Sequence, residues 1–227
     1  MFSIARIVAF TVTAVSLASA APANEVVSGL TKRVVYSCSD SAQDAFATAS
    51  YSEAQTLAAN AASYIATNGA DSLFQTYFGA STSTVLPQWV YNQISTEDGT
   101  NFTINCAPTT ECGSNIIADT AWGDTKFTTT HSDGTKTVTI GNYHATTYLC
   151  PLFYDRAPLA SLCTGASGGR ADSLVHEMSH AFAHTKDYVY GCANTRALAI
   201  SNPAEAANNA ENFGCFSIAA YQATQCS

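Results

Sequence analysis

Eight cysteines are the feature of this chain that most restricts the folds open to it. They are Cys38, Cys106, Cys112, Cys150, Cys163, Cys192, Cys215 and Cys226, and no two of them form a CxxC pair. An even number of cysteines in an exported protein favours disulfides over a redox or zinc-ribbon use. We therefore expect four disulfides that cross-link one domain, although the spacing alone does not choose their pairing.

The first twenty residues predict export. Residues 1–20 combine Arg6 with an apolar stretch from Ile7 to Leu17 and a small-residue ending, Ala18-Ser19-Ala20. This is the pattern of a signal peptide with its cleavage site. We therefore expect a secreted, extracellular protein. The sequon that begins at Asn101 is then a candidate surface glycosylation site.

A short pro-segment follows the signal peptide. Residues 21–33 end in the dibasic pair Lys32-Arg33, which is typical of a processing site. Residues 34–227 are long enough for one domain with a core of its own. No later apolar run approaches the ~20 residues that a membrane span needs. We expect a soluble mature domain over residues 34–227.

The charge balance of the mature domain is acidic. The chain has nine basic and 17 acidic side chains, of which three and one lie in residues 1–33, leaving six basic and sixteen acidic. This excess argues against nucleic acid or an anionic membrane as a partner. It is compatible with the attraction of basic peptides or proteins.

The periodicity along the chain predicts an α+β domain that is mainly helical. Helical patterns occupy residues 39–66, 73–78, 85–94, 172–184 and 204–213. Threonine, aromatic and β-branched residues broken by turn signals fill residues 101–153, where 136–140 and 145–149 are expected to form consecutive strands. We expect a small, mostly antiparallel sheet between helical halves.

The run HEMSH places His176, Glu177 and His180 on one predicted helix. Two imidazoles four residues apart project from the same side of a helix, so both can reach one metal ion. The glutamate between them can act as general base in metal-assisted hydrolysis. Chance would produce such a motif in about one chain in a hundred of this length. A purely structural zinc is the other alternative, but such sites favour cysteine-rich ligand sets.

A catalytic zinc needs a third protein ligand, and two residues are candidates for it. His184 lies one further helical step along the chain, and Asp187 lies beyond the predicted helix end. Three histidines along a straight helix would spread over about 12 Å, too far for one ion. We therefore favour Asp187, with His184 facing solvent or supporting the site.

The residues after HEMSH resemble a known family. HEMSH followed by Thr185-Lys186-Asp187-Tyr188-Val189-Tyr190-Gly191 is similar to the aspzincin signature, HExxH followed by GTxDxxYG, of fungal deuterolysins and peptidyl-Lys metalloendopeptidases. The resemblance extends to the TTYLC run ending at Cys150 and to the run at residues 206–212. His184 departs from it, because the family has glycine there.

The resemblance implies a zincin-like domain with one Zn²⁺ per chain. It implies that His176, His180 and Asp187 bind the metal, that Glu177 is the base and that Tyr190 donates a hydrogen bond to the developing oxyanion. Tyr190 packed at a turn without a catalytic role is the alternative. The resemblance also implies the disulfides Cys38–Cys106, Cys112–Cys150 and Cys163–Cys226, which leaves Cys192 with Cys215.

The expected function is that of a secreted, monomeric zinc metalloendopeptidase acting on polypeptides. Glu211 matches an acid that holds lysine in the peptidyl-Lys relatives, and Gly214 stands where a second acid would be. This pattern predicts a mild preference for basic residues, unless Glu211 is an ordinary solvated charge. We expect an extended substrate beside the strand Thr146–Leu149. The alternative function is a zinc-binding or surface-interaction protein with little or no turnover.

Overall fold

Helix α1 (Ser41–Asn68) is the longest helix and forms one side of the core. Its first turn is capped by Asp40, whose side chain accepts a hydrogen bond of 2.7 Å from the backbone N–H of Ala42. Alanines recur along its buried face and allow close helix packing, and the helix ends at Gly69, which adopts a positive φ of 62°. The helix that the alanine-rich pattern predicts over residues 39–66 is therefore confirmed within two residues at each end.

The computed structural model describes residues 35–106, 112–130 and 136–226, all within one compact unit, Thr31–Ser227. The side chains of residues 124–143 are not described. The predicted signal peptide (1–20), the pro-segment (21–33) and the turn at Ser132-Asp133-Gly134 lie outside the described residues. None of the described helices is long and apolar enough to cross a membrane.

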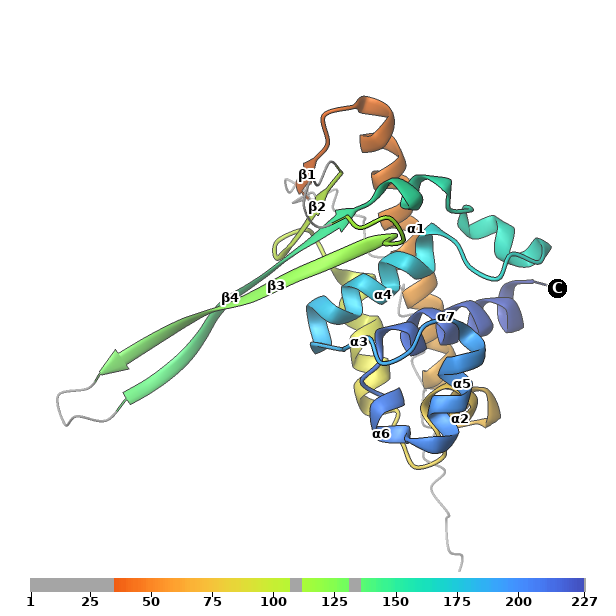
Figure 1. Cartoon of the computed structure of the whole chain (residues 1–227). Helices are drawn as coiled ribbons and strands as arrows, with labels where there is room; N and C mark the ends of the chain where they lie inside the picture. The colour runs from red at the N-terminus through yellow and green to blue at the C-terminus, as the bar shows by residue number, and fades with distance from the viewer. Residues whose placement is uncertain (1–34, 107–111, 131–135, 227) are drawn as a thin grey trace, which may run out of the picture. The chain divides into compact units, whose positions relative to one another are not determined.

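Helix α4 (Arg170–Ala183) carries the HEMSH run and packs against α1, α3, α7 and strand β3 (Figure 1). The other helices are α2 (Ser72–Phe78), α3 (Val85–Thr96), α5 (Cys192–Ser201), α6 (Pro203–Ala206) and α7 (Ala210–Gln225). Two 3₁₀ turns, Pro151–Asp155 and Leu159–Thr164, precede α4. Aromatic side chains from α2, α3 and α7 pack together in the core, where Phe78 and Tyr91 each contact Phe216.

The helix predicted over residues 204–213 is wrong in its extent. Pro203 does begin a helix, but α6 ends at Ala206 and α7 begins at Ala210. Asn209 between them has an extended backbone (φ −105°, ψ 120°). The break matters because Asn209 anchors the loop beside the HEMSH helix.

The sheet has the order β1-β2-β4-β3 and is mixed. Its strands are β1 (Val35–Ser37), β2 (Phe102–Asn105), β3 (Ala118–Thr130) and β4 (Lys136–Leu149). The longest pair, β3 with β4, is antiparallel, whereas β1–β2 and β2–β4 are parallel. The α+β fold with a small sheet is confirmed. The two strands expected at 136–140 and 145–149 are one strand, with a register shift opposite Asp124 and Thr125.

Strand β4 is an interior strand, and this overturns one expectation. Thr146 pairs with Thr103 of β2 on one side and with Ala121 of β3 on the other. Its backbone is therefore not free to pair with a substrate, so the edge expected at Thr146–Leu149 is wrong. The free edge on this side of the sheet belongs to β3, which lies beside α4 (Figure 1).

Four disulfides staple these elements. They join Cys38 to Cys106, Cys112 to Cys150, Cys163 to Cys226 and Cys192 to Cys215. The first ties β1 to the end of β2, and the last ties α5 to α7. Cross-links of this kind restrict the unfolded chain and so favour the folded state.

Candidate metal centre

Helix α4 directs His176, Glu177 and His180 of the HEMSH run toward a cleft, whereas Met178 of the same run faces the core. Leu174, Val175, Met178 and Ala181 are fully buried in the core cluster. The helix starts after Gly169, whose backbone N–H donates to the carboxylate of Asp172. His176 and His180 lie on the other side of the helix and line a cleft of about 620 Å³. A single amphipathic helix thus serves both the core and the cleft.

Three potential metal ligands converge at this cleft. Asp187 Oδ1 lies 3.1 Å from His176 Nε2 and 3.4 Å from His180 Nε2, and the two Nε2 atoms are 3.2 Å apart. Within the described chain these residues form the one cluster of His, Cys, Asp and Glu donors compact enough to hold a metal ion. Of the two candidates for a third ligand, Asp187 joins the histidine pair and His184 does not.

Six residues are enough to bring Asp187 back to the helix because the chain turns sharply at His184. This residue has φ 54° and ψ 35°, a left-handed conformation that reverses the chain after α4. Lys186 then forms a parallel bridge, donating 2.8 Å to the carbonyl of Asn208 and accepting 2.9 Å from the N–H of Ala210. The loop is therefore held on the side that faces α7.

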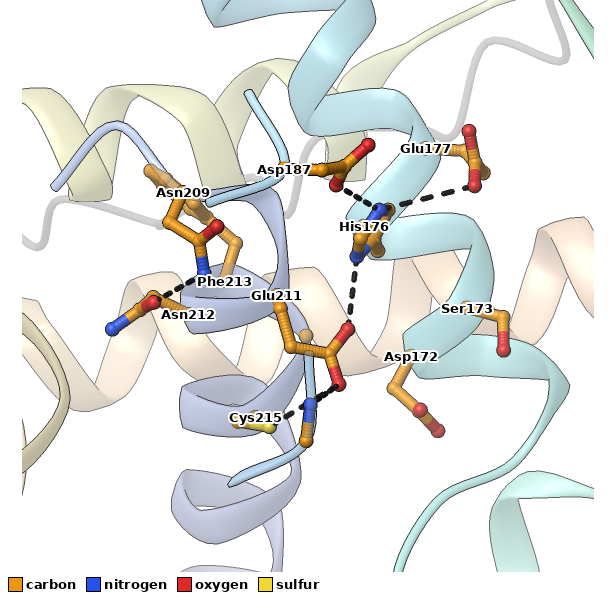
Figure 2. Close-up of polar contacts among 12 residues, drawn as sticks. Asp172, Ser173, His176, Glu177, Asp187, Asn209, Glu211, Asn212, Phe213 and Cys215 are labelled. Atoms are coloured by element: carbon orange, nitrogen blue, oxygen red, sulfur yellow. Dashed lines mark hydrogen bonds and ion pairs between the residues drawn. The ribbon is translucent and has the colours of Figure 1, made fainter. Parts of the chain in front are cut away.

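The next residues of the loop are held by the buried side chain of Asn209, from the same segment. Its Oδ1 accepts from the backbone N–H groups of Tyr188 at 2.7 Å and Val189 at 3.2 Å. Its amide in turn donates 2.6 Å to Asn212 of α7. Figure 2 shows this pair of asparagines beside Glu211. Asp187 thus lies between two anchored segments, which fixes its position relative to the helix.

Each histidine has a hydrogen-bond acceptor on the ring nitrogen that faces away from the cluster. His176 Nδ1 lies 3.0 Å from Glu211 Oε2, and His180 Nδ1 lies 2.7 Å from the carbonyl oxygen of Thr185. Donation from Nδ1 fixes the tautomer and leaves Nε2 for a metal. Figure 2 shows Glu211 and Asp187 reaching His176 from two sides.

The charges around His176 favour a cation at this position. Burial lowers the pKa of His176, but hydrogen bonds to Asp187 and Glu211 outweigh it and raise the pKa to about 10. Burial opposes ionisation of Asp187 as well, yet its hydrogen bonds to the two histidines hold its pKa well below the usual range. The cluster therefore stabilises positive charge, which a proton or a metal ion can supply.

Glu177 is buried next to the cluster and is oriented by strand β3. Thr120 Oγ1 donates 2.7 Å to Glu177 Oε2, and the same hydroxyl lies 2.7 Å from that of Thr147 on β4. Glu177 Oε1 is 4.0 Å from His176 Nε2. Burial raises the pKa of Glu177, as suits a group that accepts a proton near neutral pH.

Tyr190 lies at the mouth of the cleft. Its ring is nearly parallel to that of His176, at 13° with centroids 6.1 Å apart, and 62 % of the residue's surface is exposed. Partial burial and the nearby Asp187 carboxylate raise the pKa of Tyr190 to about 12. Its phenol therefore keeps its proton and can donate a hydrogen bond.

The structure adds residues that the sequence does not single out. Thr120 and Trp122 of β3, and Arg156 with its partner Asp172 at 3.7 Å, also line the cleft. The hydroxyl of Thr120 reaches Glu177 from 57 positions away in the sequence, so no local pattern marks it. Thr185 lies inside the motif after HEMSH, but only the fold shows that its carbonyl oxygen meets His180.

A helix that offers two histidines and a glutamate, with an aspartate returning from the next loop, defines a metalloprotein of the HExxH class. The chain belongs to the aspzincin family, whose sequence model, described as lysine-specific metallo-endopeptidase, matches residues 63–218.

Several curated relatives are named peptidyl-Lys metalloendopeptidase. The chain is 32 % identical over 196 residues to a peptidyl-Lys metalloendopeptidase of Grifola frondosa, covering 83 % of this chain and 47 % of the relative. It is 32 % identical over 175 residues to one of Pleurotus ostreatus, covering 74 % and 86 %. Against the Grifola frondosa and Armillaria mellea relatives, the chain spans about half of their length.

A solved structure shares the fold. A zinc peptidase from Grifola frondosa superimposes with a TM-score of 0.56 and 29 % sequence identity, covering 80 % of this chain and 96 % of that chain. The zincin-like architecture expected from the sequence is therefore confirmed.

Proposed function

We propose that this protein is a secreted, monomeric zinc endopeptidase that holds one Zn²⁺ through His176, His180 and Asp187. The observation that carries the proposal is the convergence of these three donors within 3.4 Å of one another beside the buried carboxylate of Glu177. The family and the relatives named above support it. One relative from Aeromonas hydrophila, 45 % identical over 71 residues, is described as an extracellular protease, in line with secretion.

The donor set fits catalytic zinc. Two imidazoles and one carboxylate leave a fourth position for water or substrate, whereas structural zinc is closed by four protein ligands, usually with cysteines. All eight cysteines are in disulfides here. A metal-storing protein on the same scaffold would need neither the oriented Glu177 nor Tyr190 at the mouth of the cleft.

Zinc bound here would polarise the scissile carbonyl and acidify a water molecule. Glu177 accepts the proton of the attacking water and delivers it to the leaving amine, while Thr120 holds the other carboxylate oxygen in place. Tyr190 donates from its protonated phenol to the oxygen on which negative charge develops. Glu211 keeps His176 oriented through its Nδ1 during these steps.

The substrate backbone is proposed to pair with the free edge of β3. Residues 115–120 and Trp122 line the cleft, next to Glu177 and the histidines. An unpaired strand edge offers backbone hydrogen bonds to an extended peptide. This assigns to β3 the role that the sequence suggested for Thr146–Leu149.

A mild preference for a basic residue on the leaving-group side is part of the proposal. The cleft lining has more acidic than basic side chains, among them Asp119, Asp172 and Glu211. Its arginine, Arg156, is paired with Asp172. Helices α7 and α4 approach closely at Gly214, where a Cβ atom would stand 3.2 Å from the carbonyl oxygen of Asp172. Position 214 therefore carries no second acid. A basic side chain of the substrate is attracted by fewer negative charges than in the peptidyl-Lys relatives.

Glu211→Gln separates the two roles open to Glu211. Both of its carboxylate oxygens are engaged, Oε2 with His176 and Oε1 with the N–H of Gly191 at 3.0 Å. We expect zinc affinity to fall about 10- to 100-fold, the usual effect of losing a group that orients a ligand. Zinc titration with a competing chelator measures this, with Glu205→Gln on α6 as the control.

Cleavage-site sequencing on a mixed peptide library tests the preference in the same two variants. Lysine and arginine are expected to be enriched next to the cut in the native protein and less so in Glu211→Gln. Equal enrichment in both would assign Glu211 to the metal site alone, and no enrichment in the native protein would refute the basic preference.

Tyr190→Phe removes the phenolic donor and keeps the ring against His176. We expect kcat to fall by about 10²-fold or more, as for loss of an oxyanion donor, with KM nearly unchanged. Steady-state kinetics on a defined peptide measures both constants. A change in KM alone would show that Tyr190 serves substrate binding instead.

The decisive experiment for the function compares the purified mature protein on casein with and without a zinc chelator. We expect proteolysis that stops on metal removal and returns with one equivalent of zinc. Stoichiometric zinc binding without proteolysis would favour the alternative of a zinc-binding protein without turnover.

A further inference from the structure

Trp122 of β3 and His184 at the end of α4 form a stacked pair next to the metal cluster. Their ring planes differ by 5° and their centroids are 3.9 Å apart. Trp122 keeps 44 % of its surface exposed, although it lines the cleft. The indole therefore covers His184 with one face, and Trp122 itself lines the cleft.

His184 has a backbone that makes such support useful. Among the described residues it is the one non-glycine residue with a positive φ. A side chain with a Cβ atom disfavours this conformation, and residues held there persist only when their surroundings stabilise them. A flat ring packed on the imidazole is a stabilising contact of that kind.

Strand β3 touches the metal helix at two linked points. Thr120 and Trp122 are two residues apart and so project from the same face of the strand. Thr120 holds Glu177 on the helix, and Trp122 holds His184, the residue that directly follows the helix end. One strand thus aligns both the proposed base and the turn that follows the helix.

That turn sets two groups of the metal site. The residue after it, Thr185, offers its carbonyl oxygen to His180 Nδ1 at 2.7 Å. Two residues later, Asp187 reaches both Nε2 atoms at 3.1 and 3.4 Å. A change in the backbone of His184 would move both groups together, because they follow it by only one and three positions.

We propose that Trp122 is a positioning residue for the metal site. Its indole holds His184 in the left-handed conformation and thereby sets the Thr185 carbonyl and the Asp187 carboxylate against the two histidines. This inference rests on the proposed function for the identity of the metal, zinc. The coupling of Trp122 to the loop through His184 does not depend on which metal is bound.

The test is a double-mutant cycle between Trp122→Ala and His184→Gly, read as zinc affinity by chelator competition. In the native background Trp122→Ala is expected to weaken zinc binding by about tenfold or more, within the range for groups that support metal ligands. In the His184→Gly background the same change is expected to matter less than about twofold. Glycine adopts the left-handed conformation without support.

Matched variants separate positioning from bulk. Trp89 of α3 has the same side chain and nearly the same exposure, 45 %, so Trp89→Ala controls for loss of a half-exposed indole. Trp122→Phe keeps a flat ring and is expected to retain zinc affinity, whereas Trp122→Leu keeps bulk without a flat face and is expected to lose it. These two variants also decide the matter if Trp122→Ala fails to fold.

A readout without metal keeps this test distinct from that of the function. The backbone N–H of Lys186 donates to Asn208 within the anchored loop. Its hydrogen exchange in the zinc-free protein is expected to speed up in Trp122→Ala and to be insensitive to that change when residue 184 is glycine. Equal losses of zinc affinity in both backgrounds, or a higher KM with unchanged zinc affinity, would overturn the proposal. Failure of the native protein to bind zinc would refute the proposed function. The hydrogen-exchange result would still test the role of Trp122.

Discussion

Replacing Glu177 with glutamine is expected to eliminate proteolysis while leaving zinc in place. Glutamine has the same shape and its amide oxygen can still accept the hydrogen bond from Thr120, but it cannot take a proton from water. General acid–base groups contribute about 10²- to 10⁴-fold to rate. We therefore expect kcat to fall by at least the lower of these factors.

The measurement combines steady-state kinetics on a defined peptide with zinc content of the purified variant. Glu205→Gln provides the control, since α6 contributes no residue to the cleft lining. The zinc content of Glu177→Gln should match that of the native protein, because Glu177 Oε1 lies 4.0 Å from His176 Nε2 and outside the three-donor cluster. Activity within about tenfold of native would rule out Glu177 as the base.

Asp187→Ala is expected to have the second large effect, on the metal itself. Removing a carboxylate that approaches both Nε2 atoms leaves two histidines to hold the ion. Loss of a supporting group costs about 10- to 100-fold in affinity, and loss of a direct ligand should exceed that range. We expect little zinc to remain after dialysis, and proteolysis to disappear with it.

His184→Asn is the matched comparison for Asp187→Ala. Asparagine tolerates the left-handed conformation of residue 184 and removes the imidazole. If Asp187 is the third ligand, this variant should keep its zinc. Loss of zinc from His184→Asn with retention in Asp187→Ala would reverse the assignment and make His184 the ligand.

Much of the fold is encoded in local patterns. The alanine repeat and Asp40 mark α1, and the stripe of Leu174, Val175 and Met178 marks the buried side of α4. These signals depend on residues within a few positions of each other, where helical period and capping act. The boundaries fail where a tertiary contact intervenes, as at Asn209, whose buried side chain interrupts the predicted helix to anchor the loop.

The sheet could not be derived in the same way. The turn signals in residues 101–153 indicate strands, but pairing of β2 beside β4 joins segments about forty residues apart along the chain. The strand order determines which strand lies at the edge of the sheet. This strand is β3, so the substrate is proposed to pair with β3 and not with β4. A local pattern has no access to that order, because hydrogen bonding between strands is decided by packing of the whole domain.

The sequence alone predicted a disulfide-linked domain with a two-histidine helix. The even number of cysteines indicates the disulfides, and the four-residue spacing of the histidines in HEMSH puts both on one side of a helix. The tertiary structure decided what surrounds that helix. It brings Asp187 to the histidines through a left-handed turn at His184, turns Glu211 toward His176, and sets Thr120 and Trp122 of β3 against the same helix. The reason is physical: a metal site needs ligands and supporting groups fixed to within fractions of an ångström, and only packing between distant segments provides that.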